Sequence, residues 1–177
     1  MSGILVILEQ QAGAWNRMSW ETLAAGQQLG AALGRSVEAA VAGKGISALA
    51  EDAATKKVSK VWAVEHDLLE AYTADGFSAA FEELVKKAQP SIVLFPHTYQ
   101  TRDFAPKLAT RFGQVLVSDV IGVRAEGGSV TFVRQFFQGK LSGDVSANGA
   151  GPHFASRFSR QRSVPGCVRP SNYLHRR

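Results

Sequence analysis

Residues 91–106 read SIVLFPHTYQTRDFAP, an apolar run that passes through a polar loop into a helical pattern. The run that ends at Pro96 shows no alternation of polar and apolar residues, which predicts a strand buried on both faces of a sheet. A helix over 104–112 and a second apolar stretch, QVLVSDVIGV (114–123), follow it. Because parallel strands need a helical crossover between them, this unit predicts an α/β fold.

The first half of the chain repeats the same alternation of strands and helices. GILVIL (3–8) is continuously apolar and predicts another central strand. Ser19 is the predicted N-cap of the first helix, and Gly34 is its predicted end. The predicted elements before residue 91 are strands over 3–8, 36–42 and 60–66 and helices over 19–33, 46–54 and 77–88.

The later part of the chain predicts antiparallel strands. EGG (126–128) precedes SVTFVRQFF (129–137), and two strands joined through a Gly-Gly turn are typical of a hairpin. The glycine-rich stretch 138–150 predicts an edge strand followed by a linker. The predicted fold class is therefore α/β and Rossmann-like, with a mainly parallel sheet flanked by helices and a late antiparallel hairpin.

Composition and charge divide the chain into a neutral body and a basic end. The 177 residues, 45% of them hydrophobic, suffice for one ordinary domain with a real core. Residues 151–177 hold six of the 20 Lys+Arg and none of the 15 Asp+Glu, so the net charge of +5 lies almost wholly there. Cys167 is the single cysteine, which argues against internal disulfides and a structural zinc site. Without a signal peptide or a long apolar run, we expect a cytoplasmic location and no direct membrane insertion.

The loop after Pro96 carries the residues that first suggest an active site. Pro106 fits only the first turn of a helix, so Asp103 is predicted to be the N-cap, a structural role that we favour over catalysis. Arg102 lies just outside that helix and is either a solvated loop residue or a contact for an anion or another subunit. His97 has no nucleophile motif or metal-ligand spacing beside it, so we expect it to pack or hydrogen-bond within the loop.

Two charges inside the later strands also need partners. Ser118 and Asp119 interrupt an apolar strand, and Arg134 interrupts the next one, so a cross-strand pair between Asp119 and Arg134 is predicted. The alternative is an edge strand with one wet face. The aromatic residues of the second strand are either core residues or an apolar interaction surface: Phe132, Phe136 and Phe137.

GKGISA (43–48) imitates a dinucleotide-binding fingerprint, with Glu65 about 20 residues further on. It follows the second predicted strand instead of the first, and its helix is short, so ordinary turn glycines are the favoured interpretation. We therefore assign no catalytic, cofactor-binding or metal-binding residue to this chain.

The combined motifs resemble one known family. IVLFPHTYQTRDFAPKLATRFGQVLVSDVIGV (92–123) and TFVRQFFQGK (131–140) are similar to the N-terminal domain of the electron transfer flavoprotein alpha subunit. The opening segment is similar as well, so the resemblance covers roughly residues 3–146. The combination of the H-T-x-x-x-R-D-x-A-P block with S-D-V carries the resemblance, because either motif alone is too short to be specific.

The resemblance implies a function and a set of partners. Members of the family pair with a beta subunit and carry electrons through FAD from dehydrogenases to a quinone reductase or other acceptors. The flavin lies mainly on the C-terminal domain of the alpha subunit, so no cofactor is expected on this chain alone. The resemblance implies a scaffold and beta-subunit interface, with these candidate interface or loop residues: His97, Thr98, Arg102, Asp103, Ser118, Asp119 and Arg134.

The end of the chain departs from the family pattern. We expect a domain over 1–146 and a basic tail over 147–177, disordered or non-native, because the tail resembles a product of the wrong reading frame or a truncation. A native basic arm for nucleic acid is the less favoured alternative, and we expect no nucleic-acid partner. A stand-alone nucleotide-binding enzyme or regulator that uses residues 43–45 is the second functional hypothesis.

Overall fold

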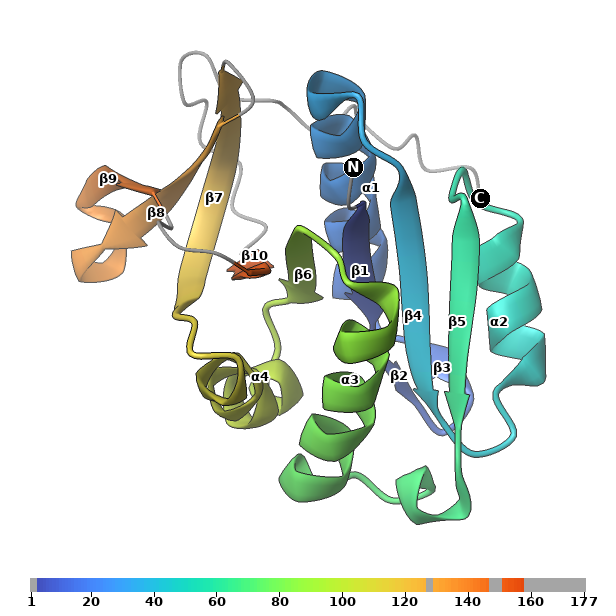
Figure 1. Ribbon diagram of the computed structural model, residues 1–177. Coiled ribbons are helices and arrows are strands. Elements are labelled where there is room, and N and C mark those ends of the chain that lie inside the picture. Colours follow the sequence, from blue (N-terminus) through green and yellow to red (C-terminus); the bar gives the residue numbers. More distant parts are fainter. Residues whose placement is uncertain (1–2, 127–128, 147–150, 158–177) are drawn as a thin grey trace.

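The computed structural model describes residues 3–126, 129–146 and 151–157, which form one large sheet covered by helices (Figure 1). The order of its eight strands is β5-β4-β1-β6-β10-β7-β8-β9. The strands are β1 (Ile4–Leu8), β4 (Val37–Gly43), β5 (Lys60–Glu65), β6 (Ile92–Pro96), β7 (Leu116–Glu126), β8 (Ser129–Phe136), β9 (Leu141–Ser146) and β10 (His153–Arg157).

The pairing of the strands confirms the predicted fold class. All neighbours from β5 to β7 are parallel, whereas β7 with β8 and β8 with β9 are antiparallel. A separate short ribbon of β2 (Gln10–Gln11) and β3 (Ala14–Trp15) follows β1. The predicted hairpin of 114–123 and 129–137 is present as β7 and β8, and the predicted edge strand after it is present as β9.

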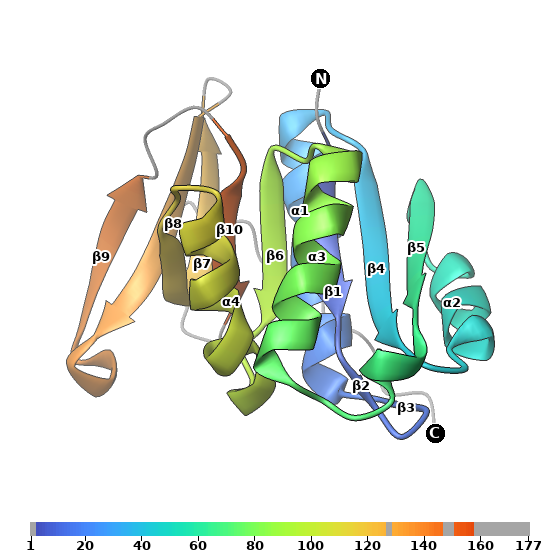
Figure 2. The same cartoon turned by 60° about the horizontal axis from the view of Figure 1, so that its bottom comes forward.

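Helices lie on both faces of the sheet (Figure 2). One core layer joins α3 (Ala74–Ala88) and α4 (Tyr99–Arg111) to the sheet, with Phe81, Phe95 and Phe104 at its centre. The other layer lies under α1 (Arg17–Leu33) and α2 (Ser47–Ala54). Helix α1 can approach the sheet closely because it has a glycine at position 26, where a Cβ atom would stand only 2.5 Å from Val6 Cγ2.

The position of strand β10 does not agree with the predicted domain organisation. Its residues were expected to belong to the basic tail, yet they form a strand in the middle of the sheet, parallel to both β6 and β7. The rings of Phe154 and Phe95 stack with their centroids 6.2 Å apart, which ties the strand to the core. The predicted boundary at residue 146 is therefore too early. The prediction for 158–177 lies outside the described residues.

Two predicted helix starts were wrong for the same reason, which is that a better-placed side chain precedes them. Asn16 caps α1 by accepting a hydrogen bond from the Met18 amide at 3.0 Å. Thr98 caps α4 by accepting from the Thr101 amide at 3.1 Å, so Asp103 lies inside the helix. Pro106 is then an interior residue, tolerated on an exposed face where water can reach the carbonyl group that the proline leaves without a donor.

Candidate functional site

Where β6 and β10 end, polar side chains come together with those of the first half of β7 and with one from β8, and we call this group the junction cluster. It combines a residue that follows β6 with residues of β10, β7 and β8: His97, Ser156, Ser118, Asp119 and Arg134. Because ligands of open α/β sheets bind at this edge, it is the first place to test for a functional site.

His97 forms the centre of the junction cluster. Its Nδ1 atom lies 3.3 Å from Ser156 Oγ, and its Nε2 atom lies 3.4 Å from Asp119 Oδ1. The side chain is only 11% exposed. His97 was expected to pack or hydrogen-bond within the loop; it is packed, and its two ring nitrogens also reach two other strands. Burial lowers the pKa of His97 below its ordinary value, the Asp119 carboxylate acts in the opposite direction, and Arg102 lowers the pKa further.

Asp119 is placed by an irregularity in β7. Its backbone has a φ of 56°, and the pairing of β7 shifts register with β10 between Val117 and Val120 and with β8 just after it, between Val120 and Gly122. The left-handed residue turns the carboxylate toward Arg134, whose Nη2 atom lies 3.6 Å from Asp119 Oδ2. Ser118 donates to the same carboxylate oxygen at 3.0 Å and accepts from Arg134 at 3.2 Å. The predicted contact between Asp119 and Arg134 is present.

Ser156, His97 and Asp119 stand in the order of a hydrolase triad, but the arrangement cannot act as one. The Ser156 side chain is 1% exposed and lies within a strand, whereas a nucleophilic serine must reach the substrate carbonyl. The chain of contacts instead connects β10 to β6, β7 and β8. No group of His, Cys, Asp or Glu side chains in the described segments could hold a metal ion.

Thr98 belongs to a second network at the same edge of the sheet, between β1 and β6. Its hydroxyl donates to Glu9 Oε2, and Glu9 Oε1 accepts from Asn16 Nδ2 at 2.8 Å. The residue that caps α4 is therefore linked to the residue that caps α1. Glu9 was missed by the sequence analysis, and its position directly after the first strand was the signal that could have identified it.

Arg102 and Asp103 are exposed on the surface of α4. Asp103 Oδ2 accepts a hydrogen bond from the Tyr72 hydroxyl at 2.8 Å. Burial first, and this bond second, raise the pKa of Tyr72 well above its ordinary value. Asp103 bonds to Tyr72 and not to the junction cluster. Arg102 lies close enough to His97 to lower the pKa of that ring.

The glycine turn after β4 has a structural explanation. Gly45 has a φ of 63°, and its amide donates to Glu65 Oε1 at 2.7 Å. In a dinucleotide-binding site, the Gly45 amide would bind a phosphate and the Glu65 carboxylate would bind a ribose. Here the two groups bind each other instead.

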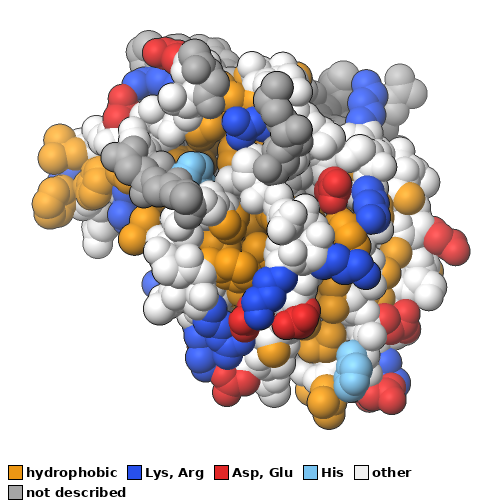
Figure 3. Space-filling view, viewed as in Figure 1, with side chains coloured by type: hydrophobic (Ala, Val, Ile, Leu, Met, Phe, Trp, Pro, Cys, Tyr) orange, Lys and Arg blue, Asp and Glu red, His pale blue; other side chains and the backbone are white. Residues whose placement is uncertain are grey.

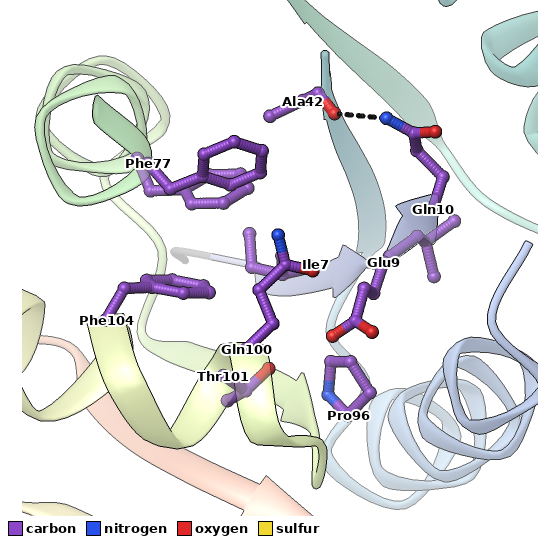
Figure 4. Close-up of a pocket in the computed structure, with 11 residues that line it drawn as sticks. Ile7, Glu9, Gln10, Ala42, Phe77, Pro96, Gln100, Thr101 and Phe104 are labelled. Atoms are coloured by element: carbon purple, nitrogen blue, oxygen red, sulfur yellow. Dashed lines mark hydrogen bonds between the residues drawn. The ribbon is translucent and has the colours of Figure 1, made fainter. Parts of the chain in front are cut away.

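A small pocket between α3, α4 and the ends of β1 and β6 offers no better ligand site (Figure 4). Three phenylalanine rings form one side of it, and Glu9, Gln10 and Gln100 lie on the other. The Gln10 amide donates to the Ala42 carbonyl at 3.2 Å, and both Glu9 oxygens already accept hydrogen bonds. The polar groups of this pocket are thus engaged within the protein, and the pocket does not fit a flavin or nicotinamide dinucleotide.

The antiparallel end of the sheet instead presents apolar side chains to solvent. We call Phe136, Phe137 and Leu141 the apolar ridge; their exposed fractions are 37%, 73% and 60%. Figure 3 shows apolar side chains gathered over β9 and the turn after β8, at the left of the view. Phe132, in contrast, is fully buried and is a core residue, whereas Phe136 and Phe137 are exposed.

The turn that carries the ridge has an unusual backbone. Phe137, Gln138 and Gly139 have φ values of 50°, 56° and 85°, so three consecutive residues are left-handed. Each left-handed residue other than glycine costs on the order of 1 kcal/mol, and such conformations concentrate at functional sites. Leu141 lies in the stretch that was predicted as an edge strand followed by a linker, and it was not singled out from the sequence.

Together these features define a Rossmann-like domain whose polar strand ends are engaged internally and whose sheet edge exposes apolar side chains. Residues 4–156 match the family described as electron transfer flavoprotein domain. The chain belongs to this family, and the match extends through most of β10.

Individual relatives agree with that assignment. The chain is 32% identical over 149 residues to an electron transfer flavoprotein subunit alpha of Syntrophomonas wolfei, and the aligned part is 84% of this chain and 46% of the relative. It is 31% identical over 137 residues to the subunit of the same name in Bacillus subtilis, which covers 77% of this chain and 42% of the relative. The chain thus spans about half the length of the curated relatives it matches.

A more distant relative carries a different name. The chain is 24% identical over 155 residues to the LctC subunit of lactate dehydrogenase (NAD(+),ferredoxin) from Acetobacterium woodii, which covers 87% of this chain and 37% of the relative. Among the residues that the structure describes, no helix is both long and apolar enough to cross a membrane.

Proposed function

We propose that this domain is the scaffolding and partner-binding part of an electron transfer flavoprotein alpha subunit. In the complete complex it would bind a beta subunit and serve FAD-mediated electron transfer from dehydrogenases to an acceptor such as a quinone reductase. FAD would be held by other parts of the complex, because neither the glycine turn after β4 nor the small pocket between α3 and α4 fits it. The domain itself would be an electron-carrier subunit without catalytic chemistry.

The single observation that supports a contact role is the apolar ridge. A pair of phenylalanines and a leucine stay exposed at a sheet edge, held there by left-handed residues that the chain would avoid without a reason. The relatives are named as alpha subunits of electron transfer flavoproteins. We therefore take a beta-type subunit as the partner of this surface. Edge strand β9 adds unpaired backbone groups beside the ridge.

The loop residues predicted from the sequence would have two different uses. Arg102 and Asp103 are exposed and available to a partner. Thr98 and the members of the junction cluster are engaged within the domain, so they would shape the neighbouring surface instead of contacting the partner directly.

The test is binding of a recombinant electron transfer flavoprotein beta subunit to the whole chain, followed by sedimentation. The substitutions Phe137→Ser and Leu141→Ser should each weaken binding at least tenfold, because a side chain that acts as a binding hot spot costs about 2 kcal/mol or more of binding free energy when it is truncated. Leu68→Ser is the matched control, since Leu68 is 78% exposed but lies at the opposite end of the sheet, in the 3-10 helix η1 (Asp67–Leu69) after β5.

Two results would contradict the proposal. One is binding that the ridge substitutions leave unchanged. The other is a stoichiometric flavin absorbance in the purified chain, since we expect none without the rest of the complex. A stand-alone nucleotide-binding role is not favoured, because Gly45 and Glu65 satisfy each other.

A further inference from the structure

Among the strands that the structure describes, β10 joins two parts of the sheet that are not otherwise paired directly. It lies between β6 and β7, so the antiparallel end of the sheet is paired to the parallel half through this strand. Its five residues come from the last described segment of the chain, far in sequence from both neighbours. A histidine lies at each end of this strand.

His97 lies at the carboxyl end of β10. It bonds to Ser156 of β10 on one side and to Asp119 of β7 on the other. The other charged groups that face this site are Arg102 on α4 and Arg134 on β8, which reaches Asp119. In the neutral ring, Nδ1 can accept from the Ser156 hydroxyl while Nε2 donates to the carboxylate. A proton on Nδ1 would turn that acceptor into a donor and leave the buried hydroxyl without its acceptor.

His153 lies at the amino end of β10. Its amide donates to the Ser91 carbonyl at 2.9 Å, at the start of β6. Its Nδ1 atom is buried and has no hydrogen-bond partner among the described residues. The charged group that faces it is Arg35, whose Nη1 atom donates to the Ser91 hydroxyl at 2.9 Å. No carboxylate is among the groups that influence this ring, so a proton here would add a positive charge beside an arginine.

We propose that His97 and His153 make the seating of β10 between β6 and β7 sensitive to protons, so that mild acid loosens this strand before the rest of the sheet. Both rings occupy their positions more favourably when they are neutral, and both are released to solvent when the strand leaves. Acidification would therefore also loosen the attachment of the apolar ridge to the parallel half. This last consequence rests on the proposed function, whereas the strand behaviour does not.

The direction of the effect follows from linkage between protonation and opening. Burial lowers the pKa of both histidines below the ordinary value of 6.5, with Asp119 opposing the shift at His97 and the arginines adding to it. The opened strand then binds more protons than the seated one below pH 6.5, so opening becomes easier as the pH falls until the seated histidines are protonated too. The opening constant should rise by up to about tenfold per histidine for each pH unit in that window.

This inference can be tested by amide hydrogen exchange of the whole chain, measured at several pH values between about 7.5 and about 5. After correction for the intrinsic exchange rate, protection of the Phe154 and Ala155 amides should fall more steeply with acidification than that of Val6 and Val41 in β1 and β4. Equal slopes at all four amides would overturn the proposal, because they would mean that β10 opens only with the whole domain.

Substitutions separate the two histidines from other sources of pH dependence. His97→Gln and His153→Gln should each remove about half of the excess logarithmic slope at β10, and the double variant should remove it. Slopes are compared within each variant, so a general loss of stability does not obscure the result. His66→Gln is the control, because His66 is exposed in the connection after β5. An unchanged excess slope in the double variant contradicts the inference, whatever the outcome of the beta-subunit experiment.

Discussion

The parallel half of the sheet and its antiparallel end differ in burial and in backbone conformation. Strands β1, β4 and β6 are buried almost throughout, and helices cover both of their faces. The antiparallel end has exposed aromatic residues and three of the non-glycine residues with positive φ: Asp119, Phe137 and Gln138. The first region is built for packing, whereas the second accepts backbone strain and solvent exposure that packing alone does not explain.

Strand β10 shows that the two regions are joined by a central element. The strand has the full burial of the parallel half at Phe154 and Ala155, while its far end reaches the junction cluster through Ser156. Loss of packing in β10 should therefore affect the whole domain, and changes on the ridge should affect only the surface.

The largest expected effect tests this contrast with two phenylalanines. Phe154→Ala removes a fully buried ring that packs on Phe95 and Phe112, and it should lower the free energy of unfolding by about 3–5 kcal/mol. Phe137→Ala removes a ring that is 73% exposed and should change it by less than about 0.5 kcal/mol. Urea unfolding of both variants provides the measurement, and similar losses would remove the distinction between the regions.

A smaller effect separates the residue that caps α4 from the residue that the sequence suggested. Thr98→Ala removes the acceptor of the Thr101 amide and the hydroxyl that binds Glu9, so it should cost about 1–2 kcal/mol of unfolding free energy. Asp103→Ala removes only an exposed contact with Tyr72 and should cost less than about 0.5 kcal/mol. Thermal unfolding of both variants measures the two losses of stability. A larger loss for Asp103→Ala than for Thr98→Ala would support Asp103 as the N-cap of α4.

The parallel half was predictable because its signals are local. Continuous apolar runs identified β1 and β6, and the spacing of Phe77, Phe81 and Leu84 identified α3. The hairpin of β7 and β8 followed from its glycine turn. Such patterns depend only on neighbours in the chain, so no tertiary information was needed to read them.

The errors arose where distant parts of the chain decide the structure. The segment 153–157 lies in an arginine-rich, acid-free end, and only the gap between β6 and β7 makes it a strand. The partners of His97 could not be predicted, because Ser156 reaches it through that strand. The contact of Asp119 with Arg134 was predictable in principle, since two opposite charges on adjacent strands need each other, but the left-handed backbone that allows it has no local signal.

The smallest expected effect concerns the electrostatics of the junction cluster, where the two regions meet. Asp119→Asn keeps a side chain that tolerates the left-handed backbone but removes the negative charge beside His97. The pKa of His97, already lowered by burial, should fall further, because the carboxylate is the group that opposes the shift. Loss of stability on acidification should then extend to lower pH. Arg102→Gln should raise the same pKa, since the arginine lowers it. NMR titration of the His97 ring would measure both shifts, and shifts of equal sign would contradict this account of the cluster.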